Sequence, residues 1–162
     1  MKVHLTLLGI FLFGWAGAHE LESIDFREVK SLAEWDAIFE EAKTNNKLVF
    51  ADAYTDWCGY CKKLDKEVFT NPEVISYFEQ HFINIKFNAE TEFGYPLADK
   101  YGIDGYPTML FLTGERNVFY HIGGFVEAPV LMAHGKEAIE NWTLLPDLLL
   151  KYDVGIIEKE EQ

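Results

Sequence analysis

The sequence predicts an α/β domain in which one β-sheet carries helices on both faces. Short apolar runs of strand length alternate along the chain with segments whose apolar residues recur at helical spacing. Capping and turn residues separate these segments, and strands interleaved with helices are typical of an α/β sheet. The chain has 162 residues, of which 49% are hydrophobic, so we expect one globular domain without room for a second.

The N-terminal part of this domain is predicted to contain a strand, a helix and a buried strand. Residues 24–26 alternate apolar and charged side chains, which is typical of a short edge strand. Ser31 and Glu34 have the spacing of a capping box, in which each side chain accepts a hydrogen bond from the other residue's backbone amide. The apolar spacing that follows predicts an amphipathic helix over 31–43. The apolar run 48–51 begins a buried strand.

The rest of the domain is predicted from the same signals. Asn71 and Pro72 suit the cap and the first turn of a helix, and Gly102 stops the helix that precedes it. The connection 113–115 has the length of a hairpin turn. The expected elements are a helix at 58–69, a helix from Asn71, a strand at 82–87, a helix at 92–101, strands at 109–112 and 118–122, helices at 129–141 and 144–151, and a frayed charged end at 158–162.

The start of the chain has the plan of a cleavable secretory signal. Lys2 supplies a positive charge, residues 5–15 are almost wholly apolar, and Ala18 ends a small-residue cleavage site. The alternative is a membrane anchor, but the apolar run is shorter than the roughly 20 residues that span a bilayer. We therefore expect a secreted, periplasmic protein without stable membrane insertion after cleavage. Its expected parts are a signal peptide at 1–18, one domain at 19–142 and a C-terminal extension of unknown role at 143–162.

Composition excludes several classes of function. The chain has 14 Lys and Arg residues against 27 Asp and Glu residues, which gives a formal net charge of -13. A surface this acidic repels nucleic-acid phosphates and anionic lipids, so neither is an expected partner. Two cysteines are too few for a disulfide-stapled scaffold or an all-cysteine zinc site.

The chemistry of the chain is expected at Cys58 and Cys61, which are three residues apart at the start of a predicted helix. This spacing places them one turn apart, close enough for a disulfide. The helix N-terminus lowers the pKa of Cys58, whereas Cys61 lies one turn in and keeps a higher pKa. Cys58 is therefore expected to attack a partner's disulfide and Cys61 to resolve the mixed disulfide. Lys62 and Lys63 either add positive potential or lie on a solvated helix face.

A structural disulfide and a metal site are the alternatives for this cysteine pair. A bridge that closes so small a loop contributes little stability through chain entropy. A metal needs further ligands, and His81, His121 and His134 are isolated in the sequence without ligand spacing. The position of the pair, after an apolar strand and at the start of a helix, favours the redox interpretation.

Several motifs in order resemble the thioredoxin superfamily. They cover roughly residues 24–142 and are most similar to its periplasmic thiol:disulfide interchange branch, which includes the C-terminal domain of DsbD. The resemblance implies a thioredoxin fold with a central mixed β-sheet flanked by helices on both faces. The motifs are Val49 to Lys62 (VFADAYTDWCGYCK), Ile85 to Asn88 (IKFN), Lys100 to Thr108 (KYGIDGYPT), Thr113 to Glu115 (TGE) and Gly123-Gly124.

The resemblance also implies roles for residues around the cysteines. Asp52 matches the buried acid of the family, which accepts the proton of Cys61 through water, and Lys86 matches the lysine that pairs with this acid. The alternatives are a surface aspartate and an exposed strand lysine. Pro107 matches the cis-proline that exposes the backbone of Tyr106 to an added substrate strand, with an ordinary trans proline as the alternative. The other substrate-binding residues implied are Trp57, Gly59, Tyr60 and Gly123.

Taken together, these features predict a secreted thiol:disulfide oxidoreductase that reduces disulfides in extracytoplasmic proteins. Apocytochrome thiols and oxidised periplasmic enzymes are candidate substrates, and a membrane partner of the DsbD kind is the expected electron donor. We expect a monomer with no metal and no cofactor other than the Cys58–Cys61 disulfide. The Gly-Tyr pair between the cysteines replaces the Gly-Pro of thioredoxin and leaves two alternatives open: a disulfide oxidase or isomerase, or a non-enzymatic redox-gated or Cu/Zn-binding module.

Overall fold

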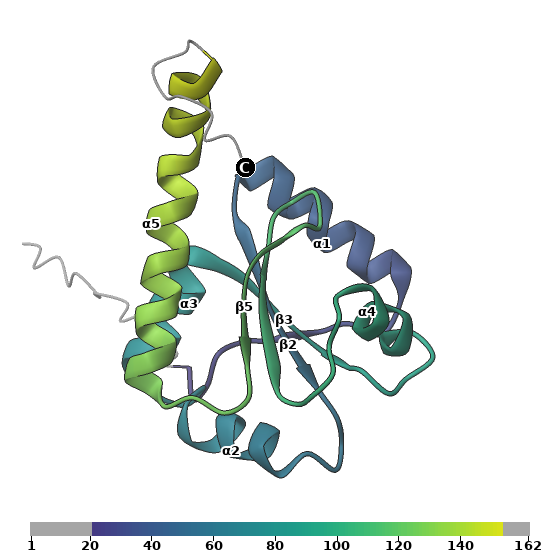
Figure 1. The fold of residues 1–162 in the computed structure, drawn as a ribbon. Coiled ribbons are helices and arrows are strands. Elements are labelled where there is room, and N and C mark those ends of the chain that lie inside the picture. The colour runs from purple at the N-terminus through teal and green to yellow at the C-terminus, as the bar shows by residue number, and fades with distance from the viewer. Residues whose placement is uncertain (1–20, 154–162) are drawn as a thin grey trace, which may run out of the picture.

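The structure, a computed structural model, describes residues 21–153 and contains a five-stranded mixed sheet with helices on both faces (Figure 1). The strand order is β1-β3-β2-β4-β5, in which β1, β3 and β2 run parallel, β4 is antiparallel to β2, and β5 is antiparallel to β4. This confirms the predicted fold class. The elements are β1 (Arg27–Glu28), α1 (Leu32–Asn45), β2 (Leu48–Tyr54), α2 (Gly59–Glu67), α3 (Pro72–His81), β3 (Phe82–Asn88), α4 (Gly94–Lys100), β4 (Thr108–Leu112), β5 (Val118–Gly123) and α5 (Ala128–Asp153).

The central strand β2 divides the core into two halves. Successive side chains of a strand point to opposite faces of its sheet. Accordingly, Val49, Ala51 and Ala53 pack with α1 and α4 on one face. Leu48 and Phe50 pack with residues of α2, α3 and α5 on the other face. Figure 1 shows α1 and α4 on one side of the sheet and α3 and α5 on the other. Asp52 shares the face of Leu48 and Phe50, and therefore points toward the α2 side.

Two helices begin at the predicted caps, with one change in detail. The Asn71 side chain accepts hydrogen bonds from the amides of Glu73 and Val74 at the start of α3, as Asn-Pro predicts. The Ser31 hydroxyl accepts from the Glu34 amide, as the capping box predicts. The Glu34 carboxylate, however, accepts a hydrogen bond of 2.8 Å from the Lys30 amide, one residue before the expected donor.

Two expected elements lie elsewhere than predicted. The edge strand expected at 24–26 lies further along the chain, where β1 pairs with β3 at Arg27 and Glu28. Ile24 is instead buried, and its amide donates to the Phe69 carbonyl at 2.9 Å, so it is not available for a strand ladder. The two helices expected at 129–141 and 144–151 are one helix, α5. No glycine or proline lies between them, and Pro146 removes one backbone donor without ending the helix.

Some predictions concern parts of the chain outside the described residues. The signal peptide at 1–18 and its cleavage site lie there, as does the charged end at 158–162. Within residues 21–153, no helix combines the length and the apolar character that crossing a bilayer requires. Helix α5 runs without a break through residue 142, the boundary expected between the domain and its C-terminal extension.

Candidate redox site

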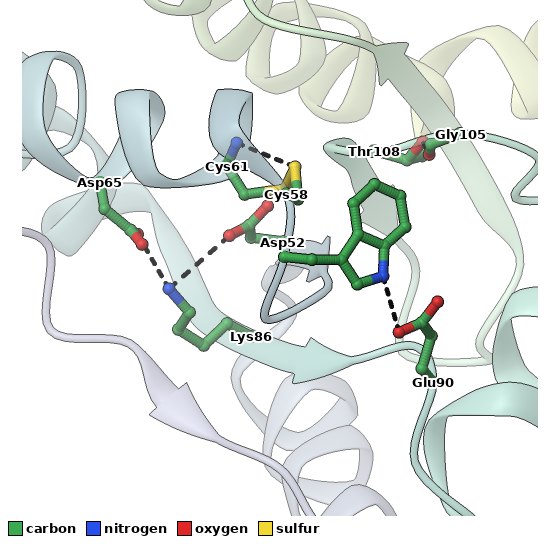
Figure 2. Close-up of a disulfide and its surroundings, with 9 residues drawn as sticks. Asp52, Cys58, Cys61, Asp65, Lys86, Glu90, Gly105 and Thr108 are labelled. Atoms are coloured by element: carbon green, nitrogen blue, oxygen red, sulfur yellow. Dashed lines mark hydrogen bonds and ion pairs between the residues drawn. A yellow bond between two sulfur atoms is a disulfide. The ribbon is translucent and has the colours of Figure 1, made fainter.

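Cys58 and Cys61 form a disulfide at the start of α2 (Figure 2). The two sulfur atoms are 2.07 Å apart and the two Cα atoms 5.3 Å apart. Cys58 is the N-cap residue of α2: its amide donates to the Thr55 carbonyl, and its Sγ accepts a hydrogen bond of 3.0 Å from the Cys61 amide. The free amides and the positive dipole end of the helix therefore lie beside Cys58 Sγ, where they favour a thiolate after reduction.

Position, rather than burial, distinguishes the two cysteines in this oxidised form. Each residue is 3% exposed, so both are buried. Only Cys58 caps the helix, whereas Cys61 lies within its first turn and donates its own amide to the Cys58 sulfur. The helix therefore provides the electrostatic asymmetry between the two sulfur atoms.

Asp52 lies close to the disulfide without a hydrogen-bond partner. It is 1% exposed, and neither of its carboxylate oxygens has a hydrogen-bond partner among the described residues. Figure 2 shows its carboxylate beside Cys58 and Cys61. Buried polar groups are normally satisfied in native structures, so an orphaned carboxylate under a disulfide indicates a functional group or a site for a water molecule.

Lys86 lies between two carboxylates and donates a hydrogen bond to only one of them. Asp52 and Lys86 occupy paired positions of β2 and β3, and Lys86 Nζ is 3.8 Å from Asp52 Oδ2. Its distance to Asp65 Oδ1 on α2 is 2.9 Å, a hydrogen-bonded ion pair (Figure 2). The ammonium also lies 4.8 Å from the ring centroid of Tyr54 and 5.4 Å from that of Phe26.

The environment of Asp52 makes its carboxyl a weak acid. The pKa of Asp52 is raised to about 7, chiefly by burial; the charge of Lys86 opposes the increase and the charge of Asp65 adds to it. A carboxyl group that titrates near neutral pH can both take up and release a proton under physiological conditions.

The loop before β4 carries a cis peptide bond between Tyr106 and Pro107, the conformation that the resemblance implied. The Pro107 carbonyl accepts a hydrogen bond of 2.7 Å from the amide of Gly124. Thr108 pairs with Gly123 in the β4–β5 register, so the turn after β5 lies beside this loop. A Cβ atom added at Gly123 would meet no heavy atom within 4 Å, which shows open space on that side of the backbone.

Aromatic side chains surround the disulfide and leave much of their surface exposed. Trp57 is 67% exposed and Tyr60 is 63% exposed, so neither belongs to the core. The Trp57 ring contacts the half-buried Tyr106 edge-on, with centroids 6.1 Å apart. The Tyr60 ring lies 6.2 Å from the Phe125 ring. The site therefore has two aromatic pairs, a surface suited to apolar protein segments.

A hydrogen bond fixes the orientation of the exposed Trp57 ring. Trp57 Nε1 donates to Glu90 Oε2 at 2.9 Å. Glu90 belongs to the loop after β3, and Figure 2 shows its carboxylate on the opposite side of the site from Asp65. The large apolar ring is thus held next to Cys58 although solvent surrounds most of it.

The sequence of the chain matches the model of the thioredoxin-like domain family over residues 35–139. This match spans more than half of the chain. The chain belongs to the thioredoxin-like domain family.

The thioredoxin-like relatives include both disulfide-isomerase and interchange proteins. A protein of Bacteroides thetaiotaomicron provisionally described as a disulphide-isomerase is 39% identical, with a TM-score of 0.63, over 74% of this chain and 95% of that one. The thiol:disulfide interchange protein DsbD of Pseudoalteromonas atlantica is 28% identical over 76% of this chain but only 22% of its own length. The chain thus spans about a fifth of the DsbD proteins that it matches. The oxidised C-terminal domain of Neisseria meningitidis DsbD shares the fold, with a TM-score of 0.59, 23% identity and coverage of 68% of this chain and 97% of that one.

The Cys58–Cys61 disulfide thus has CxxC spacing and is carried by a thioredoxin-like domain. Most of the residues singled out in the sequence lie together at this site: the two cysteines, the buried Asp52 with Lys86, and the loop of Tyr106 and Pro107.

Three residues of the site were not foreseen from the sequence: Asp65, Glu90 and Phe125. Asp65 carries a signal that was available, because it lies seven residues after Cys58, two helical turns along the same face of α2. Glu90 and Phe125 are in loops, where no periodicity predicts which side chain reaches the site. Their positions depend on contacts that only the folded chain brings together.

The histidines lie in other surroundings. His134 Nδ1 is 2.8 Å from the Tyr120 hydroxyl, and His81 packs on the ring of Tyr77. Between residues 21 and 153, no group of three His, Cys, Asp or Glu residues is arranged to hold a metal ion. Cys58 and Cys61 alone provide two ligands, fewer than a four-coordinate zinc site needs.

Proposed function

We propose that this thioredoxin-like protein reduces disulfide bonds of other proteins outside the cytoplasm. The observation that carries the proposal is the Cys58–Cys61 disulfide at the N-terminus of α2, next to a buried Asp52 that has no hydrogen-bond partner within residues 21–153. The arrangement provides an activated nucleophile, a second thiol within reach and a proton acceptor. These are the three groups that dithiol reduction of a disulfide requires.

In the first step, the reduced protein attacks its substrate through Cys58. The Cys58 thiolate, stabilised by the N-terminus of α2, forms a bond to one sulfur atom of the substrate disulfide. The substrate sulfur–sulfur bond breaks, and its second sulfur leaves as a thiolate that takes a proton from water. A mixed disulfide between Cys58 and the substrate remains.

In the second step, Cys61 resolves this mixed disulfide. The Cys61 thiol transfers its proton to Asp52, directly or through one water molecule, and its thiolate attacks Cys58 Sγ. The bond from Cys58 to the substrate breaks, and the second substrate sulfur leaves as a thiolate. Two electrons have passed to the substrate, and the protein is left in the disulfide form described above. Lys86 is the cation that faces the ionised Asp52 and limits its cost.

The substrate segment is proposed to bind along the loop of Tyr106 and Pro107. The backbone of Tyr106 can pair with an extended substrate segment as an added strand. Gly59 and Gly123 border open space, so a second chain can approach the backbone there. Apolar side chains of the substrate would contact the exposed rings of Trp57 and Tyr60.

The proposal also assigns a location, a partner and an assembly state. The signal-like residues 1–18 support secretion to the periplasm. A reductase there needs an external source of two electrons for each turnover, and a membrane protein of the DsbD kind is the proposed donor. We further propose that the protein acts as a monomer without metal or cofactor. The dithiol supplies all of the redox chemistry.

An isomerase activity is the second candidate function. It is favoured by the 39% identity to the Bacteroides thetaiotaomicron protein provisionally described as a disulphide-isomerase. An isomerase uses the same attack by Cys58 but leaves the mixed disulfide open to attack by another substrate thiol. The two activities differ in reduction potential, because an isomerase has a less stable active-site disulfide.

Single substitutions of the two cysteines test the proposed reaction. Cys58→Ala is expected to abolish reduction of insulin disulfides, because the attacking sulfur is lost. Cys61→Ala is expected to abolish turnover as well, but to accumulate a mixed disulfide that non-reducing electrophoresis detects. Each variant is the matched control of the other. Insulin reduction by Cys58→Ala at the wild-type rate would refute the proposal.

The reduction potential of the Cys58–Cys61 couple tests the direction of the reaction. Equilibration with glutathione or dithiothreitol, followed by Trp57 fluorescence, is expected to give a value close to about -270 mV, as for a reductant. A value between about -180 and -120 mV would support the isomerase or an oxidase and contradict the reductase.

A further inference from the structure

Asp65 is the carboxylate that binds Lys86, although Asp52 lies directly across from Lys86 in the sheet. Lys86 Nζ is 2.9 Å from Asp65 Oδ1 and 3.8 Å from Asp52 Oδ2. The first distance is a charge-assisted hydrogen bond and the second is too long for one. The buried carboxylate is therefore left with a cation at ion-pair distance that gives it no hydrogen bond.

Two aromatic rings hold the ammonium in this position. Lys86 Nζ lies 4.8 Å from the Tyr54 ring centroid and 5.4 Å from the Phe26 ring centroid, within the range of cation–π attraction. The Tyr54 hydroxyl donates to Glu28 at 2.8 Å, which fixes the ring. The Lys86 side chain is only 18% exposed, whereas that of Asp65 is 48% exposed. The two rings thus restrict where the Lys86 ammonium can lie, and the more exposed Asp65 carboxylate determines the direction of its hydrogen bond.

We propose that Asp65 is a positioning residue that holds the Lys86 ammonium away from Asp52, so that Asp52 keeps no hydrogen-bond partner among the described residues and can hold the proton released by Cys61. This inference rests on the proposed function, in which Asp52 is the proton acceptor. Without Asp65, a movement of the ammonium by about one ångström would give Asp52 a charge-assisted hydrogen bond. Such a bond would favour the ionised carboxylate and weaken it as a base.

The charged groups around Asp52 come from three elements. Lys86 faces it from β3, and Asp65 faces Lys86 from α2. Glu28 of β1 interacts with the charge of Lys86, accepts a hydrogen bond from the Tyr54 hydroxyl and is itself paired with Lys30. The position opposite Asp52 in β4 is the uncharged Met109, and the cysteines of α2 carry no charge in the disulfide form. Asp65 and Lys86 are therefore the two charges that set the protonation of Asp52.

The test measures the protonation of Asp52 directly in the oxidised protein, by a carbon-13 NMR titration of its carboxyl carbon. Asp65→Asn, which keeps the shape of the side chain, is expected to lower the Asp52 midpoint by about one pH unit or more. Glu67→Gln is the matched control, because it removes a charge from the same helix at a residue that pairs with Lys63. An unshifted Asp52 midpoint in Asp65→Asn would overturn the proposal.

A double substitution separates positioning from simple repulsion between the two carboxylates. Removal of the Asp65 charge would itself lower the Asp52 midpoint somewhat, even if Lys86 never moved. In a Lys86→Met background, Asp65→Asn is therefore expected to shift the midpoint by less than half as much as in the wild-type background. An equal shift in both backgrounds would show repulsion alone and refute positioning. Asp65→Glu, which retains the ion pair, is expected to restore a midpoint close to that of the wild type.

The outcome is independent of the proposed activity. The titration needs no substrate and no turnover, so it succeeds or fails whether or not the protein reduces disulfides. The link to the reaction is tested separately, by the pH profile of insulin reduction. If Asp52 accepts the proton of Cys61, the rising limb of this profile is expected to move to lower pH in Asp65→Asn, in parallel with the NMR midpoint. A profile that stays in place while the midpoint moves would contradict Asp52 as proton acceptor and leave the positioning by Asp65 intact.

Discussion

The two ends of the β2–β3 strand pair differ in how their polar side chains are satisfied. Near the amino end of β3, the buried Asn84 amide nitrogen donates to the Phe78 carbonyl and to the Glu79 carboxylate, each at 3.2 Å. Near the carboxyl end of β2, two register pairs further on, Asp52 has no hydrogen-bond partner in the part of the chain that the structure describes. The amino end therefore uses the Asn84 amide nitrogen for structure and leaves only its Oδ1 without a partner, while at the redox end both carboxylate oxygens of Asp52 lack one among the described residues.

Exposed aromatic rings also lie at the redox end, where the large rings of Trp57 and Tyr60 are exposed. At the amino end, Arg27 is bound to Glu41 and Lys47 to the Gln80 carbonyl. The aliphatic Val118 is exposed at the same end of the sheet. Unsatisfied polar groups and exposed rings both cost stability. Their combination at the redox end indicates that this end is arranged for reactivity and binding, and that the other end stabilises the fold.

Removal of the buried charge is expected to produce the largest change. The folded-state pKa of Asp52, about 7, lies above its ordinary value of 3.8. Below pH 3.8 the carboxyl is protonated in both the folded and the unfolded state, so Asp52 does not lower the free energy of unfolding. As the pH rises from 3.8 toward about 7, the carboxyl ionises in the unfolded state first, and the free energy of unfolding falls. Above about pH 7 the carboxyl is ionised in both states, and the full loss of stability remains. Asp52→Asn is therefore expected to raise the free energy of unfolding at pH 8 by up to about 4 kcal/mol, at 1.36 kcal/mol per pKa unit.

Urea unfolding of the wild type and Asp52→Asn from pH 4 to pH 8.5 measures this effect. The difference between the two proteins is expected to grow with pH and to become constant above neutral pH. The same substitution is expected to slow insulin reduction, because Cys61 loses its proton acceptor. A difference in stability that does not change with pH would contradict the assignment of Asp52 as a buried group with a raised pKa.

The matching substitution at the amino end is expected to act in the opposite direction. Asn84→Ala removes two hydrogen bonds and leaves the buried Phe78 carbonyl without that donor. The expected loss is about 1–2 kcal/mol of unfolding free energy. The loss is not larger because the substitution also removes Asn84 Oδ1, a buried atom that already lacks a partner among the described residues. Urea unfolding is expected to show the same loss at pH 6 and pH 8, and insulin reduction by the folded variant is expected to be unchanged. A slowed reaction would remove the distinction between the two ends.

The sequence predicted the elements and residues whose signals are local. Asn71 and Pro72 marked the start of α3 because capping involves neighbouring residues only. The apolar run around Asp52 indicated its burial, since an acid within a buried strand has few other places to lie. The position of Cys58 at the start of α2 followed from the strand and the helix on its two sides.

Features that depend on packing were predicted less well. β1 lies beyond the predicted residues because the Phe69 carbonyl binds the Ile24 amide, a contact between segments far apart in sequence. The sequence predicted that Lys86 pairs with Asp52, but not that Asp65 pairs with the same ammonium at a shorter distance. The sequence shows which residues are charged, whereas the fold determines which of the two carboxylates hydrogen-bonds to the Lys86 ammonium.

The smallest effect is expected from the ion pair at the surface of the amino end. Arg27 donates two hydrogen bonds to the Glu41 carboxylate, one of them at 3.0 Å, and these bonds lower the pKa of Glu41. Because the pKa is lowered, the contribution is present at neutral pH and is lost as pH falls through the ordinary range of a glutamate. Both side chains are exposed by more than a third, so solvent screens the pair. Glu41→Gln is expected to cost at most about 1 kcal/mol at low salt and less in 1 M sodium chloride, as measured by thermal unfolding. A loss of stability that persists at high salt would mean that the two hydrogen bonds of the Arg27–Glu41 pair, rather than the attraction of its charges, stabilise this end of the sheet. The amino end would then differ from the redox end in how its hydrogen bonds are satisfied, and not in its charges.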